Sequence, residues 1–240
     1  MDPTSVAREV AEGLAAEGAE AVVLVGSHAR GDAGPESDVD LLAVGPEEFS
    51  FELERRSGSL VSMTSRPYEA YRRGLADPGS VCAAVPGWRE AVILQDPEGK
   101  AASLIEEAGA WTWERLERRC DEWVGEEICS LAEEVHKLVS ALRQGDWQTA
   151  AVQRSILAAH LAPILAVHRR ILYDSENRLW DLVGDAMGQD AVRSPRPRRG
   201  AVQGDGRCRA RTVRACGRRG VRSLRRAPEG RRGSRSQARL

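Results

Sequence analysis

Residues 21–44 read AVVLVGSHARGDAGPESDVDLLAV, and this stretch decides the fold. It opens with Ala21–Val25, a short apolar run rich in β-branched residues, which predicts a buried strand. Gly26 and Ser27 end that run, and a loop containing glycine and proline separates it from a second apolar run over residues 39–44. The stretch therefore predicts two strands joined by a glycine-rich connection.

Polar residues with a definite chemistry stand at the facing ends of these two strands. Gly26 and Ser27 place backbone N–H groups and a hydroxyl at the start of a helix, an arrangement that suits a phosphate. Asp38 and Asp40 are two residues apart, so their side chains point to one face of the sheet. Two carboxylates so close repel each other unless a cation lies between them, and Mg²⁺ prefers such oxygen ligands together with substrate phosphates. The pattern predicts metal-assisted phosphoryl chemistry.

Each of these four residues also has a purely structural interpretation. Gly26 would serve only to end a strand, Ser27 to cap a helix, and Asp38 to form a turn. Asp40 is harder to explain in this way, because a lone carboxylate within an apolar strand costs several kcal/mol to bury.

Two further polar side chains lie on the connection between the strands. Arg30 is predicted to contact phosphate or to pair with Asp32, and the sequence favours neither alternative. His28 is predicted to be an exposed residue at the start of a helix rather than a base.

The motif G-S-x-A-x-G at residues 26–31, followed by S-D-V-D-L at residues 37–41, resembles the signature of the polymerase-β-like nucleotidyltransferases. The resemblance is strongest to the small prokaryotic members related to aminoglycoside nucleotidyltransferases. It implies that Gly26, Ser27 and Arg30 bind the nucleotide, and that Asp38 and Asp40 are catalytic residues that hold Mg²⁺. The implied reaction moves a nucleoside monophosphate from ATP or another nucleoside triphosphate to a hydroxyl acceptor. The acceptor is unidentified, and an aminoglycoside-like small molecule is one candidate.

The sequence departs from this family at a third carboxylate, which the family usually carries on the next core strand. That strand is predicted over residues 60–64, which read LVSMT and contain no acid, while Glu52 and Glu54 lie upstream on what reads as a connection. Glutamates of the later helices are candidates for a base, with no basis for choosing among them: Glu126, Glu127, Glu133 and Glu134. A catalytically degenerate nucleotide-binding or antitoxin-like regulatory module is therefore the alternative function.

The remaining sequence predicts an α+β fold, with a small mixed sheet and flanking helices followed by a helical region. A fourth strand is expected over residues 91–94, and the expected helices cover residues 5–16, 68–76, 101–108, 111–143, 148–172 and 179–187. Gly145 supplies the turn before residues 148–172, and Asp146 is the expected N-cap. We predict a nucleotidyltransferase core over residues 1–97, a helical, acceptor-binding domain over residues 98–192 and a tail over residues 193–240.

Charge divides the chain sharply. The 240 residues carry a net charge of −1, but residues 193–240 contain 17 arginines and only two acids, a charge of +15, which leaves −16 for residues 1–192. The tail has no aromatic residue and few aliphatic ones, so we expect it to be disordered. It is either a native arginine-rich arm that binds nucleic acid or, as we favour, the product of a frameshift in a G+C-rich gene.

Composition also bounds location and partners. No segment reaches the roughly 18 uninterrupted apolar residues of a membrane span, so no membrane partner is expected. The five cysteines show no CxxC spacing, which argues against a zinc site or a disulfide framework and favours a reducing cytoplasm. Oligomeric state cannot be derived from the sequence.

Overall fold

The computed structural model describes residues 2–46 and 49–188. The strands in these residues are β1 (Ala21–Val25), β2 (Val39–Val44), β3 (Phe49–Arg56), β4 (Ser59–Arg66) and β5 (Val92–Gln95). The helices are α1 (Pro3–Ala16), α2 (Gly26–Arg30), α3 (Tyr68–Leu75), α4 (Val81–Arg89), α5 (Lys100–Gly109), α6 (Glu117–Ser130), α7 (Ala132–Gln144), α8 (Trp147–Arg169) and α9 (Glu176–Met187), with a 3₁₀ turn over Trp113–Arg115. The tail predicted over residues 193–240 lies outside the described residues.

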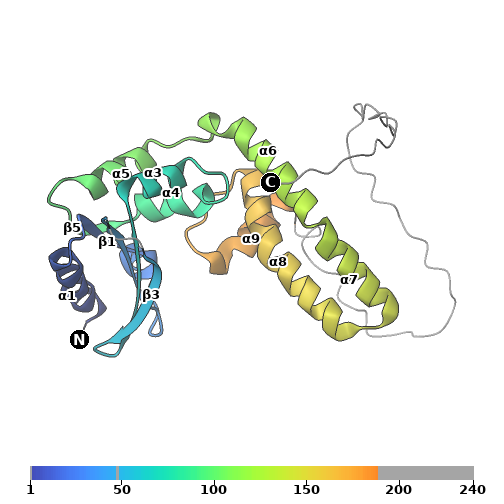
Figure 1. The fold of residues 1–240 in the computed structure, drawn as a ribbon, viewed down its shortest axis with the longest axis horizontal. Helices are drawn as coiled ribbons and strands as arrows, with labels where there is room; N and C mark the ends of the chain where they lie inside the picture. The colour runs from blue at the N-terminus through green and yellow to red at the C-terminus, as the bar shows by residue number, and fades with distance from the viewer. Residues whose placement is uncertain (1, 47–48, 189–240) are drawn as a thin grey trace, which may run out of the picture. The chain divides into compact units, whose positions relative to one another are not determined.

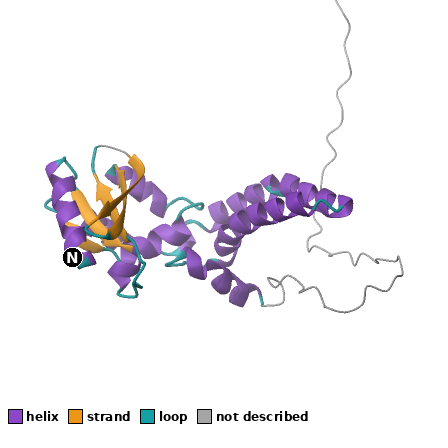
Figure 2. Cartoon of the chain, turned by 90° about the horizontal axis from the view of Figure 1, so that it is seen from below, coloured by secondary structure: helices purple, strands orange, loops and turns teal. Residues whose placement is uncertain are grey.

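The strands form one mixed sheet in the order β3-β4-β2-β1-β5 (Figure 1, Figure 2). Strands β2 and β4 are parallel, and every other neighbouring pair is antiparallel. All strands precede α5, and helices make up the rest of the described chain. The predicted α+β class, with a small mixed sheet and flanking helices, is confirmed.

Strand β1 is apolar throughout because both of its faces are covered. Successive side chains of a strand point to opposite faces of the sheet. Val23 belongs to a buried cluster with Trp88 of α4 and Leu104 of α5, whereas Leu24 belongs to one with Val6 of α1. Helix α1 therefore covers one face of the sheet, and the group α3 to α5 covers the other (Figure 1). This two-sided burial holds the end of β1, where the candidate site lies, in a fixed place.

Strand β3 corrects the interpretation of residues 49–56 as a connection. Glu52 and Glu54 lie on this strand, which pairs antiparallel with β4 at the edge of the sheet. An edge strand leaves much of its surface in water, so it accommodates charged residues that would not fit in a central strand. Leu53, between the two glutamates, is itself 52% exposed.

The helical part also differs from prediction in one place. The single helix expected over residues 111–143 is wrong, because the chain forms a 3₁₀ turn and then two helices, α6 and α7, separated at Leu131. The expected cap is confirmed: Gly145 adopts φ +71°, and Asp146 Oδ1 accepts a hydrogen bond of 3.0 Å from the Thr149 N–H at the start of α8.

Helix α8 is the one helix of the described residues that is long and apolar enough, by length and composition alone, to cross a membrane. The core helix of a globular protein passes the same test, so this property by itself assigns no membrane role.

The domain boundaries proposed at residues 97/98 and 192/193 remain predictions, and the second of them lies outside the described residues. Just after the boundary at residues 97/98, Ala101 and Leu104 of α5 pack in the same buried cluster as Val23 of β1. Helix α5 thus packs against the sheet.

Candidate functional site

The two halves of the sequence motif meet at one end of β1 and β2. Val25, the last residue of β1, pairs in register with Asp40 of β2. The next residue, Gly26, adopts φ +70°, a left-handed conformation that favours glycine. A Cβ atom on Gly26 would collide with Asp40 Oδ2, so the backbone approaches this carboxylate as closely as glycine alone allows.

Helix α2 begins at this contact and is one short turn. The Gly31 N–H and the Asp32 N–H both bond to the Ser27 carbonyl, at 3.0 Å and 3.1 Å, and Gly31 ends the helix at φ +80°. The first N–H groups of a helix have no partner within it. Backbone donors and the Ser27 hydroxyl therefore lie on the same short turn that begins against Asp40.

Asp38 and Asp40 are both half-buried and lie close enough to influence each other. Burial raises the pKa of the Asp40 carboxyl above its ordinary value, and a hydrogen bond from Ser62 opposes that rise. The negative charge of Asp38 raises the pKa of Asp40 further, while His28 and Arg30 lower it. A bound cation would relieve both the desolvation and the repulsion, so this pair of oxygen donors fits a divalent metal.

Ser62 is a site residue whose role the sequence did not reveal. It is buried on β4, in register with Asp40 across the parallel pair, and its Oγ donates a hydrogen bond of 2.5 Å to Asp40 Oδ1. It thus occupies a position on the strand where an acid was expected. Among residues 2–46 and 49–188, no group of three or more His, Cys, Asp or Glu side chains is arranged to hold a metal ion.

The imidazole of His28 is half-buried, which corrects the expectation of an exposed side chain. Its Nε2 atom is shielded from water and has no hydrogen-bond partner in the described part of the chain. His28 lies close enough to Asp40 for a proton on its imidazole to lower the pKa of that carboxyl.

Arg30 lies among carboxylates, and the pairing with Asp32 is one of its contacts. The guanidinium donates to the Asp174 carbonyl at 3.0 Å and lies 3.3 Å from an Asp32 oxygen. The carboxylates of Asp174 and Glu90 lie 3.9 Å and 4.0 Å from its Nε. Arg30 therefore ties α2 to the segment between α8 and α9, and its binding of nucleotide stays a prediction.

This link predicts that Arg30→Ala lowers the free energy of unfolding by about 2 kcal/mol, because the largely buried guanidinium would no longer bond to the Asp174 carbonyl or lie beside its carboxylate. The carboxylates of Asp32 and Glu90 are exposed and contribute less. Arg178→Ala is the matched control: Arg178 also pairs with Asp174, at 3.2 Å, but its side chain is 61% exposed. We expect the control to cost less than about 1 kcal/mol. Urea unfolding measures both, and equal losses would contradict the assignment of Arg30 as the principal tie.

The raised pKa of Asp40 predicts a pH-dependent contribution to stability. The folded protein binds a proton at Asp40 more tightly than the unfolded chain, whose carboxyl has a pKa near 3.8. The stabilisation is therefore complete below that pH and is lost as the pH rises through the folded-state pKa. We expect Asp40→Asn, which does not titrate, to gain stability relative to the wild type across this window. Urea unfolding between about pH 3 and pH 7 tests this, and a difference that does not vary with pH would refute it.

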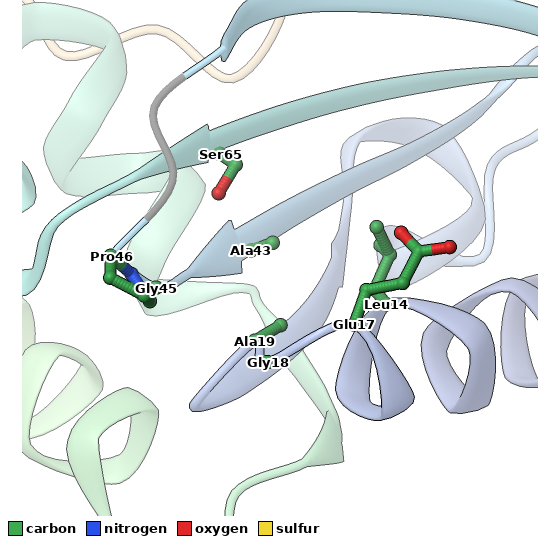
Figure 3. A pocket seen from close by; sticks show the side chains of 8 residues that line it. All are labelled: Leu14, Glu17, Gly18, Ala19, Ala43, Gly45, Pro46 and Ser65. Carbon is green, nitrogen blue, oxygen red and sulfur yellow. The ribbon is translucent and has the colours of Figure 1, made fainter.

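A separate small cavity lies at the opposite end of β2 (Figure 3). Its lining includes Leu14 of α1, Ala43 of β2 and Ser65 of β4. Its volume of about 30 Å³ is close to that of one water molecule, so it is too small for a nucleotide.

Residues 7–69 match the family profile of the nucleotidyltransferase domain, and this range contains the Gly26, Ser27, Asp38 and Asp40 positions. Among solved structures, the chain is similar to a nucleotidyltransferase-like protein from Exiguobacterium sibiricum, with a TM-score of 0.47 and 16% identity. That similarity covers 75% of this chain and 61% of the other, so the chain spans less than two thirds of its solved neighbour. No curated protein matches the sequence.

Proposed function

Because residues 7–69 match the family profile of the nucleotidyltransferase domain, we propose that the protein belongs to the polymerase-β-like superfamily and transfers a nucleoside monophosphate from a nucleoside triphosphate to an acceptor hydroxyl. The observation that carries this proposal is the contact between the Gly26 backbone and the Asp40 carboxylate. It brings the turn proposed to bind phosphate against one of the two carboxylates proposed to bind metal, at one end of the sheet.

In the proposed reaction, the acceptor oxygen forms a bond to the α-phosphorus. The bond from the α-phosphorus to the bridging oxygen breaks, and pyrophosphate leaves. Gly26 and Ser27 hold the leaving phosphates through backbone N–H groups and the Ser27 hydroxyl. Asp38 and Asp40 would hold Mg²⁺, and the chemistry that Mg²⁺ supplies is neutralisation of the charge on the reacting phosphates. Ser62 keeps the Asp40 carboxylate in one orientation.

The acceptor hydroxyl must lose a proton, and a carboxylate is the proposed base. Among the four glutamates of α6 and α7 considered for this role, Glu133 is the least suited. Lys137 lies 2.7 Å from its carboxylate and holds its pKa below the ordinary value, which weakens it as a base. For the acceptor, the charge of −16 over residues 1–192 supports a polycationic small molecule such as an aminoglycoside. We place the enzyme in the cytoplasm on the cysteine pattern.

Ser62 also favours the second candidate function, a degenerate module that binds nucleotide without transferring it. A hydroxyl in register with Asp40 leaves the site with two metal-binding carboxylates, and a single weakly bound metal would support binding better than catalysis.

One experiment separates the two functions. The protein is incubated with Mg²⁺ and α-labelled nucleoside triphosphates in the presence of candidate acceptors, and label transfer is followed beside nucleotide binding. Transfer that is lost in Asp40→Asn supports the enzyme. Binding without transfer to any acceptor supports the degenerate module, and the absence of both contradicts the site.

A further inference from the structure

Three arginines converge on an open groove away from the candidate site. Arg66 ends β4, Arg73 lies on α3 and Arg119 lies on α6. The groove has a volume of about 620 Å³, within the range of pockets that hold small molecules. The turn between α3 and α4, with Asp77 and Ser80, completes its lining.

The groove carries an excess of positive charge. In the part of the chain that the structure describes, no carboxylate lies within ion-pair distance of Arg66, Arg73 or Arg119. Arg119 donates a hydrogen bond of 2.9 Å to the Ala76 carbonyl, which fixes it at the rim of the groove. Asp77 is the one acid in the lining, and the Ser80 hydroxyl bonds to its Oδ2 at 3.0 Å.

The arginines next to two of these three in the sequence, by contrast, pair with carboxylates. Arg72, next to Arg73 on α3, lies 3.0 Å from Glu107 and 3.5 Å from Glu69. Arg118, next to Arg119 on α6, lies 3.7 Å from Glu122. In a body with an excess of acidic residues, cations usually find carboxylates nearby. Within residues 2–46 and 49–188, these three arginines on three separate elements have no carboxylate partner. An anion in the groove would relieve their mutual repulsion.

We propose that this groove binds a small ligand carrying a polyphosphate group. Guanidinium groups bind phosphoryl oxygens through paired, charge-assisted hydrogen bonds, and three of them exceed what one phosphoryl group needs. The lining carries three guanidinium groups against the one carboxylate of Asp77, a net charge of +2, and a groove of this volume has room for more than one phosphoryl group.

The groove is distinct from the candidate catalytic site. Asp40 is in register with Ser62 on β4, and Val44 with Arg66, so the two sites lie at opposite ends of the parallel pair. Four residues of strand separate them by about 13 Å. The proposal therefore stands independently of the nucleotidyl transfer proposed above.

The test is calorimetric titration of the full chain with pyrophosphate in EDTA, which removes divalent metal. The wild type is expected to bind, and Arg66→Gln/Arg73→Gln is expected to weaken the interaction at least about tenfold. Arg72→Gln and Arg118→Gln each remove one positive charge beside the groove, next to Arg73 on α3 and next to Arg119 on α6, and are expected to retain binding. Residues 193–240 are basic and are present in every variant. Pyrophosphate binding that remains in the double variant therefore measures how much of the binding is due to these residues.

Two further measurements fix the location. Asp40→Asn should leave pyrophosphate binding unchanged. A thermal melt of each variant should show that it remains folded. If the double variant Arg66→Gln/Arg73→Gln is unfolded, Arg66→Gln and Arg73→Gln are measured separately in its place. No binding by the wild type, equal loss in the control variants, or a strong change in Asp40→Asn would each overturn the proposal.

Discussion

Asp38→Asn and Asp40→Asn are each expected to abolish the stabilisation of the protein by Mg²⁺ and nucleoside triphosphate. In the wild type this stabilisation should be about 2–3 kcal/mol at a hundredfold excess of ligand over Kd. Asparagine keeps the shape of aspartate but removes one of the two charges proposed to bind the metal. Nucleotidyl transfer should fall by about a thousandfold or more, because charge on the reacting phosphates would no longer be neutralised.

The same variants should not weaken the free protein. Asp40 is half-buried beside Asp38 with a raised pKa, so its charge is unfavourable to the fold near neutral pH. Asp40→Asn should therefore be as stable as the wild type, or slightly more stable. Thermal melts with and without Mg²⁺-ATP and Mg²⁺-GTP measure both effects. A variant destabilised by about 1–3 kcal/mol with its response to ligand intact would identify a purely structural aspartate.

Gly26→Ala is expected to lower the free energy of unfolding by about 3 kcal/mol and to remove nucleotide binding. Two costs combine: a left-handed conformation at φ +70°, and a methyl group in the space taken by Asp40 Oδ2. Moving the Asp40 carboxylate would relieve the collision but would displace a group proposed to bind the metal and disturb its hydrogen bond with Ser62.

Gly31→Ala is the matched control for this variant. Gly31 is also left-handed, at φ +80°, but a Cβ there would meet nothing within 4 Å. We expect it to cost about 1–2 kcal/mol, from conformation alone, and to leave nucleotide binding intact. Urea unfolding and nucleotide titration of both variants give the comparison. Equal stability of the two would show that the approach of Gly26 to Asp40 is not tight in solution.

The parts of the fold that follow local rules could be predicted from the sequence. The apolar runs over residues 21–25 and 39–44 became β1 and β2 with those bounds, and Asp146 caps α8. The two strands follow from burial of their apolar residues, and the cap follows from a hydrogen bond between residues close in sequence. Helix α4 was not predicted, because Pro86 and Gly87 break the local pattern, yet burial of Val85 and Trp88 holds it.

The site could be predicted only as far as its motif. Gly26 and Asp40 belong to one local pattern, so their meeting follows once β1 and β2 pair. Ser62 carries no signal of its own in a sequence, and only the register of β2 against β4 brings it to Asp40. Asp174 lies 144 residues from Arg30, beyond any local rule.

The contact between Arg30 and Asp174 bears on the order in which the chain acquires its structure. It closes a loop of 144 residues, and contacts of such separation carry a large entropic cost before they form. During synthesis, the turn that follows β1 is complete long before Asp174 leaves the ribosome. Until then Arg30 has only Asp32 and Glu90 as anionic neighbours among those described here. In a chain cut at residue 97, Arg30 would keep Asp32 and Glu90 as neighbours and would lack its hydrogen bond to the Asp174 carbonyl, so the side chain at the end of α2 would lose its most distant tie.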